Sequence, residues 1–507
     1  MNPTRIAAVA AAASASGVAR AQEGLDATID RIVTPLSDAL SAAIFYEIPI
    51  PFIDRGVPFI VVWLVVAALF FTFYFRFISM RALKHAFGLV RGDFTPPDAA
   101  GEVTHFQALA TALSGTVGLG NIAGVALAVS LGGPGATFWM IVAGLFSMST
   151  KFAECTLGVK YRNEYADGTV SGGPMYYLSK GVAREYPRLA GLGKLLAVVF
   201  SVFCIGAAGG AGTMFQSNQA FSQLVNVTGG VDSPLNGFGW LFGLVVALLV
   251  GLVIIGGIKS IARVTEKIVP FMGLVYVLAG LVIIGLNIER LPDAFGAIVR
   301  GAFQPEGMYG GFIGVLIMGF RRAAFSNEAG VGSAAIAHSA VRTDKPVTEG
   351  LVALYEPFID TVIVCTITAL VIVITGSLDP TGQIQGVELT SRAFSSVIDW
   401  FPQVLLAAVL LFAFSTIISW SYYGLKAFTY LFGEGLGKEL VFKALVLMAV
   451  VVGASINLTS VMDFADAMLL AMAVPNLIGV YLLTPVVRRE LDAYWADYKA
   501  GRLTTYR

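Results

Sequence analysis

Two short stretches place glycines beside polar side chains inside otherwise apolar segments. Residues 115–121 read GTVGLGN and residues 325–333 read FSNEAGVGS. Glycine tolerates unwound backbone better than other residues, and unwound backbone at membrane depth leaves amide and carbonyl groups that need partners. Amide N–H groups at the start of a half-helix suit an anion, and freed carbonyls suit a small cation. The stretches therefore predict a site for a carboxylate and a cation. The alternative is that the glycines only let helices pack closely.

Further polar residues in apolar surroundings are candidates for the same site. Gln216 needs a hydrogen-bond partner there, which is either a substrate or a neighbouring helix. Asp360 is an intramembrane carboxylate, which is costly and usually functional, and its candidate roles are ammonium partner, cation ligand and proton carrier. Asn327 and Glu328 are candidates for those roles too. The alternative for Asp360 is an ion pair with one of three basic residues, Arg321, Arg322 and Lys345.

The elements that must hold these residues are apolar helices. Of the 507 residues, 56% are hydrophobic and 13% are charged, against about 25% charged in soluble domains. The apolar residues gather in runs of roughly twenty, the length that crosses a bilayer. On one run, Lys151 and Glu154 have the spacing of an ion pair within a helix. We predict an all-α polytopic membrane protein with eleven spans, at about 57–75, 106–130, 136–160, 195–222, 236–257, 268–287, 310–340, 350–376, 402–430, 441–458 and 464–486.

The distribution of Lys and Arg predicts the orientation. Basic connections, such as 76–91 and 160–194, alternate with connections poor in Lys and Arg, such as 131–135 and 225–235. Because basic loops stay in the cytoplasm, we expect the N-terminus outside, the C-terminus inside and an odd number of spans. The expected location is a cell membrane, in particular the inner membrane of a bacterium.

Each glycine stretch opens a block of five spans, and the first span stands outside both blocks. Because five is odd, the second block must be inverted relative to the first, and paired broken helices in inverted repeats are the best sequence indication of a transporter's binding site. The apolar spacing within 288–309 predicts a helix on the membrane surface. The predicted organisation is a signal peptide at 1–21, or alternatively a retained leader, then a periplasmic segment with the extra first helix at 22–105, a first repeat at 106–287, the external interfacial segment at 288–309, a second repeat at 310–486 and a cytoplasmic tail at 487–507.

Several function classes are disfavoured. The net charge is zero, which gives no indication of a nucleic-acid partner, and the three cysteines form no metal-binding pair. The chain contains no HExxH, Walker A or GxSxG motif, so an enzyme or an ATP-driven pump is a weaker reading. A secondary carrier is favoured, and a channel remains the first alternative because two broken helices can also form a filter.

Six segments together resemble the alanine or glycine:cation symporter family, also called the sodium:alanine symporter family. They are TVGLGNIAGVALAVSLGGPGATFW, KFAECTLGVKYR, GGPMYYL, FSNEAGVGSA, FIDTVIVCTITAL and FAFSTIISWSYYG, in family order from about residue 106 to 486. The resemblance implies uptake of alanine or glycine driven by sodium, or alternatively by protons. It also implies the five-plus-five inverted-repeat fold of leucine-transporter-type carriers, with the lipid bilayer and a small amino acid as the only implied partners.

The resemblance further implies a set of site residues. The substrate carboxylate would lie on the backbone amides of Leu119 and Gly120. One sodium ion would use Thr116 and Asn121, and a second would use the carbonyls of Ser114 and Val117 with the hydroxyls of Ser415 and Thr416. The substrate pocket would comprise Thr116, Gly118, Leu119, Gly120, Asn121, Gln216, Phe325, Ser326 and Trp420.

Overall fold

The protein is almost entirely helical. The computed structural model describes residues 39, 41–49, 56–303, 311–378, 386–397 and 400–506, so the predicted signal peptide lies outside the described residues. The strands in that part of the chain are two short antiparallel pairs, β1 (Glu47–Ile48) with β2 (Val57–Pro58) and β3 (Asn163–Glu164) with β4 (Val170–Ser171). The predicted all-α class is therefore confirmed for the described residues.

The first half of the chain contains one sharp corner and one broken helix. Helix α2 (Phe59–Tyr74) is followed by α3 (Ile78–Arg91) at an angle of 73°. Helix α4 (His105–Thr116) starts at a capping box formed by Thr104 and Gln107, and it meets η1 (Gly120–Gly124) and α5 (Val125–Gly132) at a bend of 50°. The remaining elements of this half are α6 (Gly135–Lys160), α7 (Pro174–Tyr176), η2 (Tyr177–Gly181), α8 (Val182–Glu185), η3 (Pro187–Leu189), α9 (Ala190–Gly209), η4 (Gly210–Met214), α10 (Phe215–Val227), η5 (Gly230–Asp232), α11 (Gly239–Ile254) and α12 (Gly257–Leu286).

The second half also contains a broken helix. Helix α14 (Gly311–Asn327) is separated from α15 (Ala334–His338) by residues 328–333, which are not helical. Two short helices, α13 (Leu291–Phe303) and α19 (Val387–Ser395), lie between the longer elements. The other elements are η6 (Ile288–Arg290), α16 (Pro346–Val352), α17 (Tyr355–Pro357), η7 (Phe358–Cys365), α18 (Thr366–Ile374), α20 (Phe401–Phe432), α21 (Leu436–Ser455), α22 (Leu458–Ala471) and α23 (Ala473–Lys499).

Length and apolar composition identify membrane-spanning elements among the described residues. Six helical segments are long and apolar enough to cross a bilayer, and the number rises to eight if each of the two bent pairs counts as one span. Helix α11 is apolar but shorter. The protein is therefore a multi-pass membrane protein, and the count of eleven spans stays a prediction.

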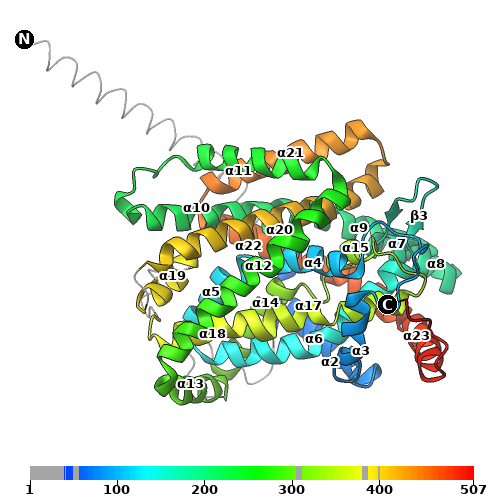
Figure 1. Cartoon of the computed structure of the whole chain (residues 1–507), viewed down its shortest axis with the longest axis horizontal. Helices are drawn as coiled ribbons and strands as arrows, with labels where there is room; N and C mark the ends of the chain where they lie inside the picture. The colour runs from blue at the N-terminus through cyan, green and yellow to red at the C-terminus, as the bar shows by residue number, and fades with distance from the viewer. Residues whose placement is uncertain are drawn as a thin grey trace, which may run out of the picture.

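The halves of the two broken helices are paired crosswise. Helix α15 packs against α4, whereas α14 packs against η1 and α5. The start of the first broken helix thus meets the end of the second, which is the arrangement of two antiparallel neighbours. In Figure 1 the long helices run across the view, α13 and α19 lie at one end, and α3, α8, α23 and the C-terminus lie at the other, which we call the C-terminal side.

A small backbone junction joins α4 and α15 at the C-terminal side. Val103 pairs with Val341 in an isolated parallel bridge, and the N–H of Arg342 donates to the carbonyl of Val103 at 2.8 Å. The guanidinium of Arg162, at the end of α6, spans this junction and donates to carbonyl oxygens on both segments, those of Ala100 (2.8 Å), Ser339 (3.0 Å) and Val341 (2.6 Å). Residues before α4 and after α15 are therefore held as one unit.

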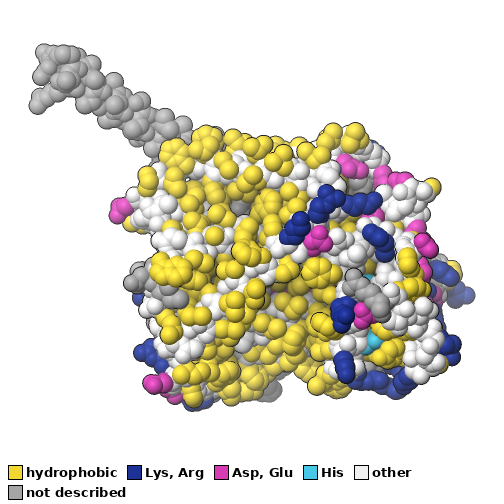
Figure 2. Space-filling model, viewed as in Figure 1, with side chains coloured by type: hydrophobic (Ala, Val, Ile, Leu, Met, Phe, Trp, Pro, Cys, Tyr) yellow, Lys and Arg dark blue, Asp and Glu magenta, His cyan; other side chains and the backbone are white. Residues whose placement is uncertain are grey.

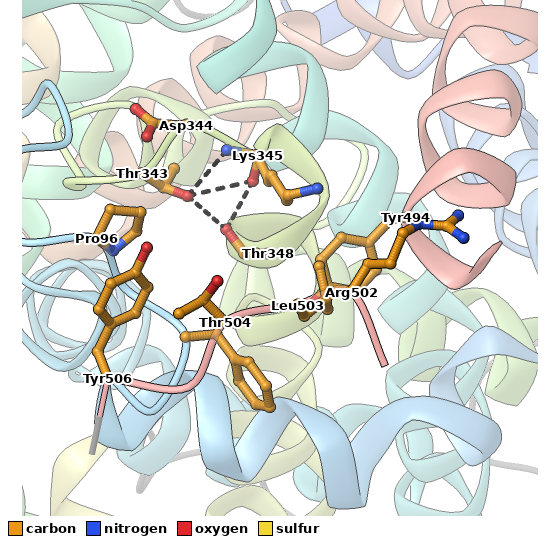
Figure 3. Close-up of a pocket in the computed structure, with 11 residues that line it drawn as sticks. Pro96, Thr343, Asp344, Lys345, Thr348, Tyr494, Arg502, Leu503, Thr504 and Tyr506 are labelled. Atoms are coloured by element: carbon orange, nitrogen blue, oxygen red, sulfur yellow. Dashed lines mark hydrogen bonds between the residues drawn. The ribbon is translucent and has the colours of Figure 1, made fainter. Parts of the chain in front are cut away.

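The C-terminal residues cover the loop that follows this junction. Helix α23 continues to Lys499, so the segment predicted as a tail from residue 487 is largely helical. The residues after it leave a cavity of about 210 Å³ against the loop, in which Thr343, Lys345 and Thr348 are hydrogen-bonded to one another (Figure 3). This cavity lies apart from the two helix breaks.

Two other connections differ in the detail of their helices. Residues 76–91 were expected as a loop but form α3, because Ile78, Ala82 and Leu89 fall on one face and are buried. The predicted helix within 288–309 is present as α13, with Ala294 and Ile298 buried. Its placement on the outer membrane surface stays a prediction.

Candidate functional site

The first break leaves two backbone N–H groups that side-chain amides satisfy. Helix α4 ends at Thr116, and the N–H of Gly118 donates to Oδ1 of Asn121 at 2.9 Å. The N–H of Leu119 donates to Oε1 of Gln216, on α10, at 3.1 Å. These residues are buried. The break lies where the glycines predicted it, and a carbonyl-type oxygen already occupies the position predicted for a substrate carboxylate.

The second break contains an uncommon backbone conformation. Glu328 has a φ of +56°, a left-handed value that non-glycine residues rarely adopt. Its carboxylate accepts hydrogen bonds from the hydroxyl of Ser333 and from Nε1 of Trp420, the latter at 3.1 Å. The side-chain Oδ1 of Asn327 accepts from the N–H of Ala329 at 3.0 Å. Side-chain bonds thus hold the unwound segment in one conformation.

A buried polar cluster connects the two breaks. Nδ2 of Asn121 donates to Oδ1 of Asp360 at 2.6 Å and to the hydroxyl of Ser326 at 3.0 Å. The hydroxyls of Ser326 and Thr361 donate to Oδ2 of Asp360 at 2.7 and 2.8 Å. Each of these four residues is at most 1% exposed. The structure therefore brings together residues of η1, α14 and η7 that are far apart in sequence.

The ion-pair alternative for Asp360 is wrong. The three basic residues named as its alternative partners pair with other carboxylates: Arg321 and Arg322 with Asp466, and Lys345 with Asp497. The carboxylate of Asp360 instead accepts hydrogen bonds from three neutral side chains, those of Asn121, Ser326 and Thr361. A buried carboxylate surrounded in this way is suited to a cation.

The second predicted cation site is only partly assembled. The hydroxyl of Thr416 donates to the carbonyl of Ser114 at 2.9 Å, which joins α20 to α4. The hydroxyl of Ser415 donates to the carbonyl of Phe412 at 3.1 Å instead, so it does not bond to Ser114 through its side chain. The side chain of Thr116 also turns away, donating back to the carbonyl of Ala112 within α4 at 3.3 Å.

Aromatic rings close the space around the first break. A methyl group added at Gly120 would lie 3.4 Å from the ring of Phe325. The ring of Phe215 packs edge-on against Phe325, with centroids 5.5 Å apart. Trp420 is 1% exposed and lies so close to Gly212 that an added methyl there would come within 2.3 Å of it. These contacts leave little space for an added side chain at the first break or at Gly212.

Sequence reasoning missed a chain of buried ionisable groups beside the site. Lys151 pairs with Glu356 at 3.0 Å, so the predicted pair with Glu154 is wrong. His338 contacts Glu349 at 2.5 Å, and Glu349 also bonds to His105. The spacing of Glu349 and Glu356, seven residues apart in an apolar run, was a signal that both face one side of a helix.

Glu154 has a different role from the one its spacing predicted. Its Oε1 accepts a hydrogen bond from Nδ2 of Asn476, on α23, at 2.6 Å. The same amide nitrogen donates to the carbonyl of Gly330 at 2.8 Å, in the second break. Asn476 therefore bonds to the unwound segment at Gly330, and Glu154 holds the amide of Asn476 in position.

The arrangement can bind an anionic group and a cation, and this binding involves no covalent step. Backbone N–H groups at the first break can hold an anionic group, and the Asp360 cluster can hold a cation with oxygen ligands. Both lie between helices whose halves are separate elements, so the groups around a ligand can move relative to one another.

Comparison with known proteins gives a consistent result. The profile of the sodium:alanine symporter family matches residues 50–507. The chain is 43% identical over 440 residues to the sodium/alanine symporter AgcS of Methanococcus maripaludis, covering 86% of this chain and 94% of that protein. It is 33% identical over 447 residues to the probable sodium/glutamine symporter GlnT of Bacillus subtilis, covering 87% and 89%.

Among solved structures, the chain resembles MhsT in complex with L-phenylalanine. The TM-score is 0.55 at 15% identity, and the match covers 75% of this chain and 88% of that chain. This likeness shows the fold alone, which is of the leucine-transporter type. The family match over most of the sequence identifies the chain as a membrane transporter rather than an enzyme. The chain is a cation-coupled amino-acid symporter and belongs to the sodium:alanine symporter family.

Proposed function

We propose that this protein couples the inward movement of sodium to the uptake of alanine or glycine by alternating access. The observation that carries the proposal is the polar cluster of Asn121, Ser326 and Asp360, which joins the two breaks beside the N–H groups of Gly118 and Leu119. The N–H groups can hold the carboxylate of an amino acid, and the carboxylate of Asp360 beside them can hold a co-transported cation. One compact site can therefore bind both.

The substrate carboxylate takes the place that Gln216 now occupies. Its Oε1 accepts from the N–H of Leu119, and a carboxylate oxygen accepts from the same donor more strongly because it is charged. The amide nitrogen of Gln216 donates to the carbonyl of Ala211 at 3.0 Å and has a second N–H that can donate to the substrate. Gly118 and Gly120 contribute no side chain, so the backbone can approach the ligand closely.

The aromatic rings set the size limit. Phe325 covers Gly120 and Trp420 covers Gly212, which supports alanine or glycine over a longer side chain. The relatives also include a probable sodium/glutamine symporter. The higher identity to the sodium/alanine symporter, 43% against 33%, favours the smaller substrate.

Sodium enters as a co-transported ion at the Asp360 cluster. Three oxygen atoms accept from Nδ2 of Asn121 there, namely the hydroxyl of Ser326 and the backbone carbonyl and Oδ1 of Asp360. The N and O atoms of an amide are assigned from hydrogen bonds rather than seen directly. With a cation present, the amide of Asn121 turns its oxygen toward the carboxylate of Asp360. Protons are the alternative coupling ion, since a buried carboxylate can carry one.

The remaining candidates take different roles in the proposal. Ser114 and Thr416 form the core of a second sodium site, with the carbonyl of Val117. Glu328 positions Trp420 through the bond to its Nε1, and Asn327 positions the second break. Neither is needed as a cation ligand.

The proposed topology keeps eleven spans with an external N-terminus and a cytoplasmic C-terminus. Figure 2 supports the orientation, because Lys and Arg side chains gather mainly toward the C-terminal side while hydrophobic side chains cover the middle of the face. The bend between Thr116 and Gly120 and the break at 328–333 then lie in spans of opposite direction.

Uptake into proteoliposomes tests the proposal. Labelled alanine and glycine are offered under an imposed sodium gradient and, separately, under an imposed pH gradient. Accumulation above the outside concentration that saturates and requires the sodium gradient is the expected result. Passive, non-saturating equilibration would establish the channel alternative, and accumulation under the pH gradient alone would replace sodium with protons. Asn121→Ala should weaken the sodium dependence.

A further inference from the structure

An open apolar groove lies on the outer face of the first broken helix. It has a volume of about 500 Å³ and is bounded by α3, α4, α12 and the segment from α17 to η7. Its walls include Phe87, Phe106 and Val117, and the first two are 57% and 41% exposed. The side chains of the Asp360 cluster (Asn121, Ser326, Asp360 and Thr361) do not line this groove.

The groove exists because α12 lacks bulk at one point. Pro270 and Gly273 lie on its floor, and a methyl group added at Gly273 would have no atom within 4 Å. The opposite wall is fixed by Tyr355, whose hydroxyl donates to the carbonyl of Leu83 on α3 at 2.7 Å. This hydrogen bond joins α17 to α3, so two of the elements that bound the groove are held together.

One end of the groove carries positive charge. Arg263 and Lys267 lie seven and three residues before Pro270, which places them on the same face of α12 as the groove. Lys84, which is exposed, precedes Phe87 by one turn of α3. The carboxylate of Glu266, between the two basic residues of α12, accepts a hydrogen bond from Gln107 at 2.9 Å. Figure 2 shows basic side chains beside hydrophobic ones on this face of the molecule.

We propose that this groove is a binding site for one anionic phospholipid, whose acyl chain fills the apolar hollow and whose phosphate lies at Lys84, Arg263 and Lys267. The walls belong to a multi-pass membrane protein, where acyl chains are the solvent for apolar surface. A basic cluster beside an apolar groove matches an amphiphile that has an apolar chain and an anionic headgroup. A zwitterionic lipid carries its own positive group and gains less from the cluster.

A lipid in this position touches the transport machinery. Val117, which forms part of the groove wall, is the residue at which α4 stops being helical and directly precedes Gly118. The acyl chain therefore packs against the first break from outside, while the substrate lies against it from inside. The bound lipid holds α4 in the position seen here, so the transport rate depends on the content of anionic lipid.

Photo-crosslinking tests the site without any need for transport activity. The full-length protein is placed in phosphatidylcholine nanodiscs that contain a trace of phosphatidylglycerol or phosphatidylcholine with a diazirine on its acyl chain. Crosslinks are mapped by mass spectrometry to peptides that cover residues 106–117 and 269–277. We expect the phosphatidylglycerol probe to label these peptides in clear preference to the phosphatidylcholine probe.

Two sets of variants make the test specific. Gly273→Leu fills the groove and should abolish the labelling, whereas Gly285→Leu, on the same helix and also without neighbours within 4 Å, should leave it unchanged. The triple variant Lys84→Gln/Arg263→Gln/Lys267→Gln should remove the preference, with about a fivefold loss for each basic residue. Equal labelling by both probes in the wild type, or unchanged labelling in Gly273→Leu, would overturn the proposal. Neither result bears on sodium-coupled uptake, which the proteoliposome assay measures separately.

Discussion

The guanidinium of Arg162 donates a 2.6 Å hydrogen bond to the carbonyl oxygen of Val341, and so ties the end of α6 to the chain that leaves α15. The same group donates to the carbonyl of Ala100, before α4. One side chain therefore fastens the C-terminal-side halves of both broken helices. In an alternating-access carrier this junction must loosen when the site opens to that side.

Replacing Arg162 should shift the carrier toward the state that is open at the C-terminal side. Hydrogen bonds from a charged donor contribute about 1.5–3 kcal/mol, so Arg162→Gln should raise amide hydrogen exchange at residues 100–103 and 339–343 by about tenfold or more. Lys160→Gln is the control, because it removes only a partly exposed pair with Glu490. Equal exchange in the two variants would assign Arg162 a merely static role.

A single methyl group at Gly118 should stop transport. The added carbon would lie 2.5 Å from Oγ1 of Thr416 and 3.1 Å from Oε1 of Gln216, and packed interiors do not absorb such overlaps freely. Gly124→Ala is the matched control, since no atom lies within 4 Å of the added carbon on the same broken helix. Uptake should be lost in Gly118→Ala and kept in Gly124→Ala. Comparable uptake in both would place the substrate elsewhere.

Removing the charge of Asp360 should uncouple uptake from sodium. Asp360→Asn keeps the size of the side chain but loses the attraction for a cation, so the sodium concentration for half-maximal uptake should rise about tenfold or more. Thr361→Val removes one hydrogen bond to the same carboxylate and should have a smaller effect. Sodium titrations of alanine uptake provide the measurement. An unchanged sodium dependence in Asp360→Asn would show that Asp360 does not bind the sodium ion.

The buried pair of Lys151 and Glu356 should be more important for folding than for transport. Both side chains are fully buried, and removing one partner of such a pair costs about 3–5 kcal/mol because the other charge is left uncompensated. Lys151→Met should therefore lower the Tm in detergent markedly, and the double variant Lys151→Met/Glu356→Leu should recover much of it. A double variant no more stable than the single one would show that the pair itself supplies the stability.

Trp420 should limit the size of the substrate. Trp420→Ala opens the space over Gly212 and should let leucine compete with alanine for uptake, which it should not do in the wild type. Trp420→Phe keeps a ring but loses the bond to Glu328, so it separates the bulk of the side chain from its hydrogen bond. An unchanged competition profile in Trp420→Ala would remove this residue from the pocket wall.

The sequence was informative wherever the cause of a structure is local. Both breaks were predicted because glycine and asparagine act on their own stretch of backbone. The partners of buried polar and charged side chains were not predicted, because they are distant in sequence. Lys151 and Glu356 are 205 residues apart, and Asn121 and Asp360 are 239 residues apart. The direction of the Ser415 hydroxyl depends on one rotamer, which no sequence pattern specifies.

The crosswise pairing of half-helices has a mechanical consequence. Each end of the molecule contains one half of each broken helix, so any displacement there bends the chain at both unwound stretches together. The two stretches act as parallel hinges, and the side chains of Asn121, Ser326 and Asp360 lie across the gap between them. A bound cation or substrate would brace both hinges at once, which makes the loaded carrier stiffer than the empty one.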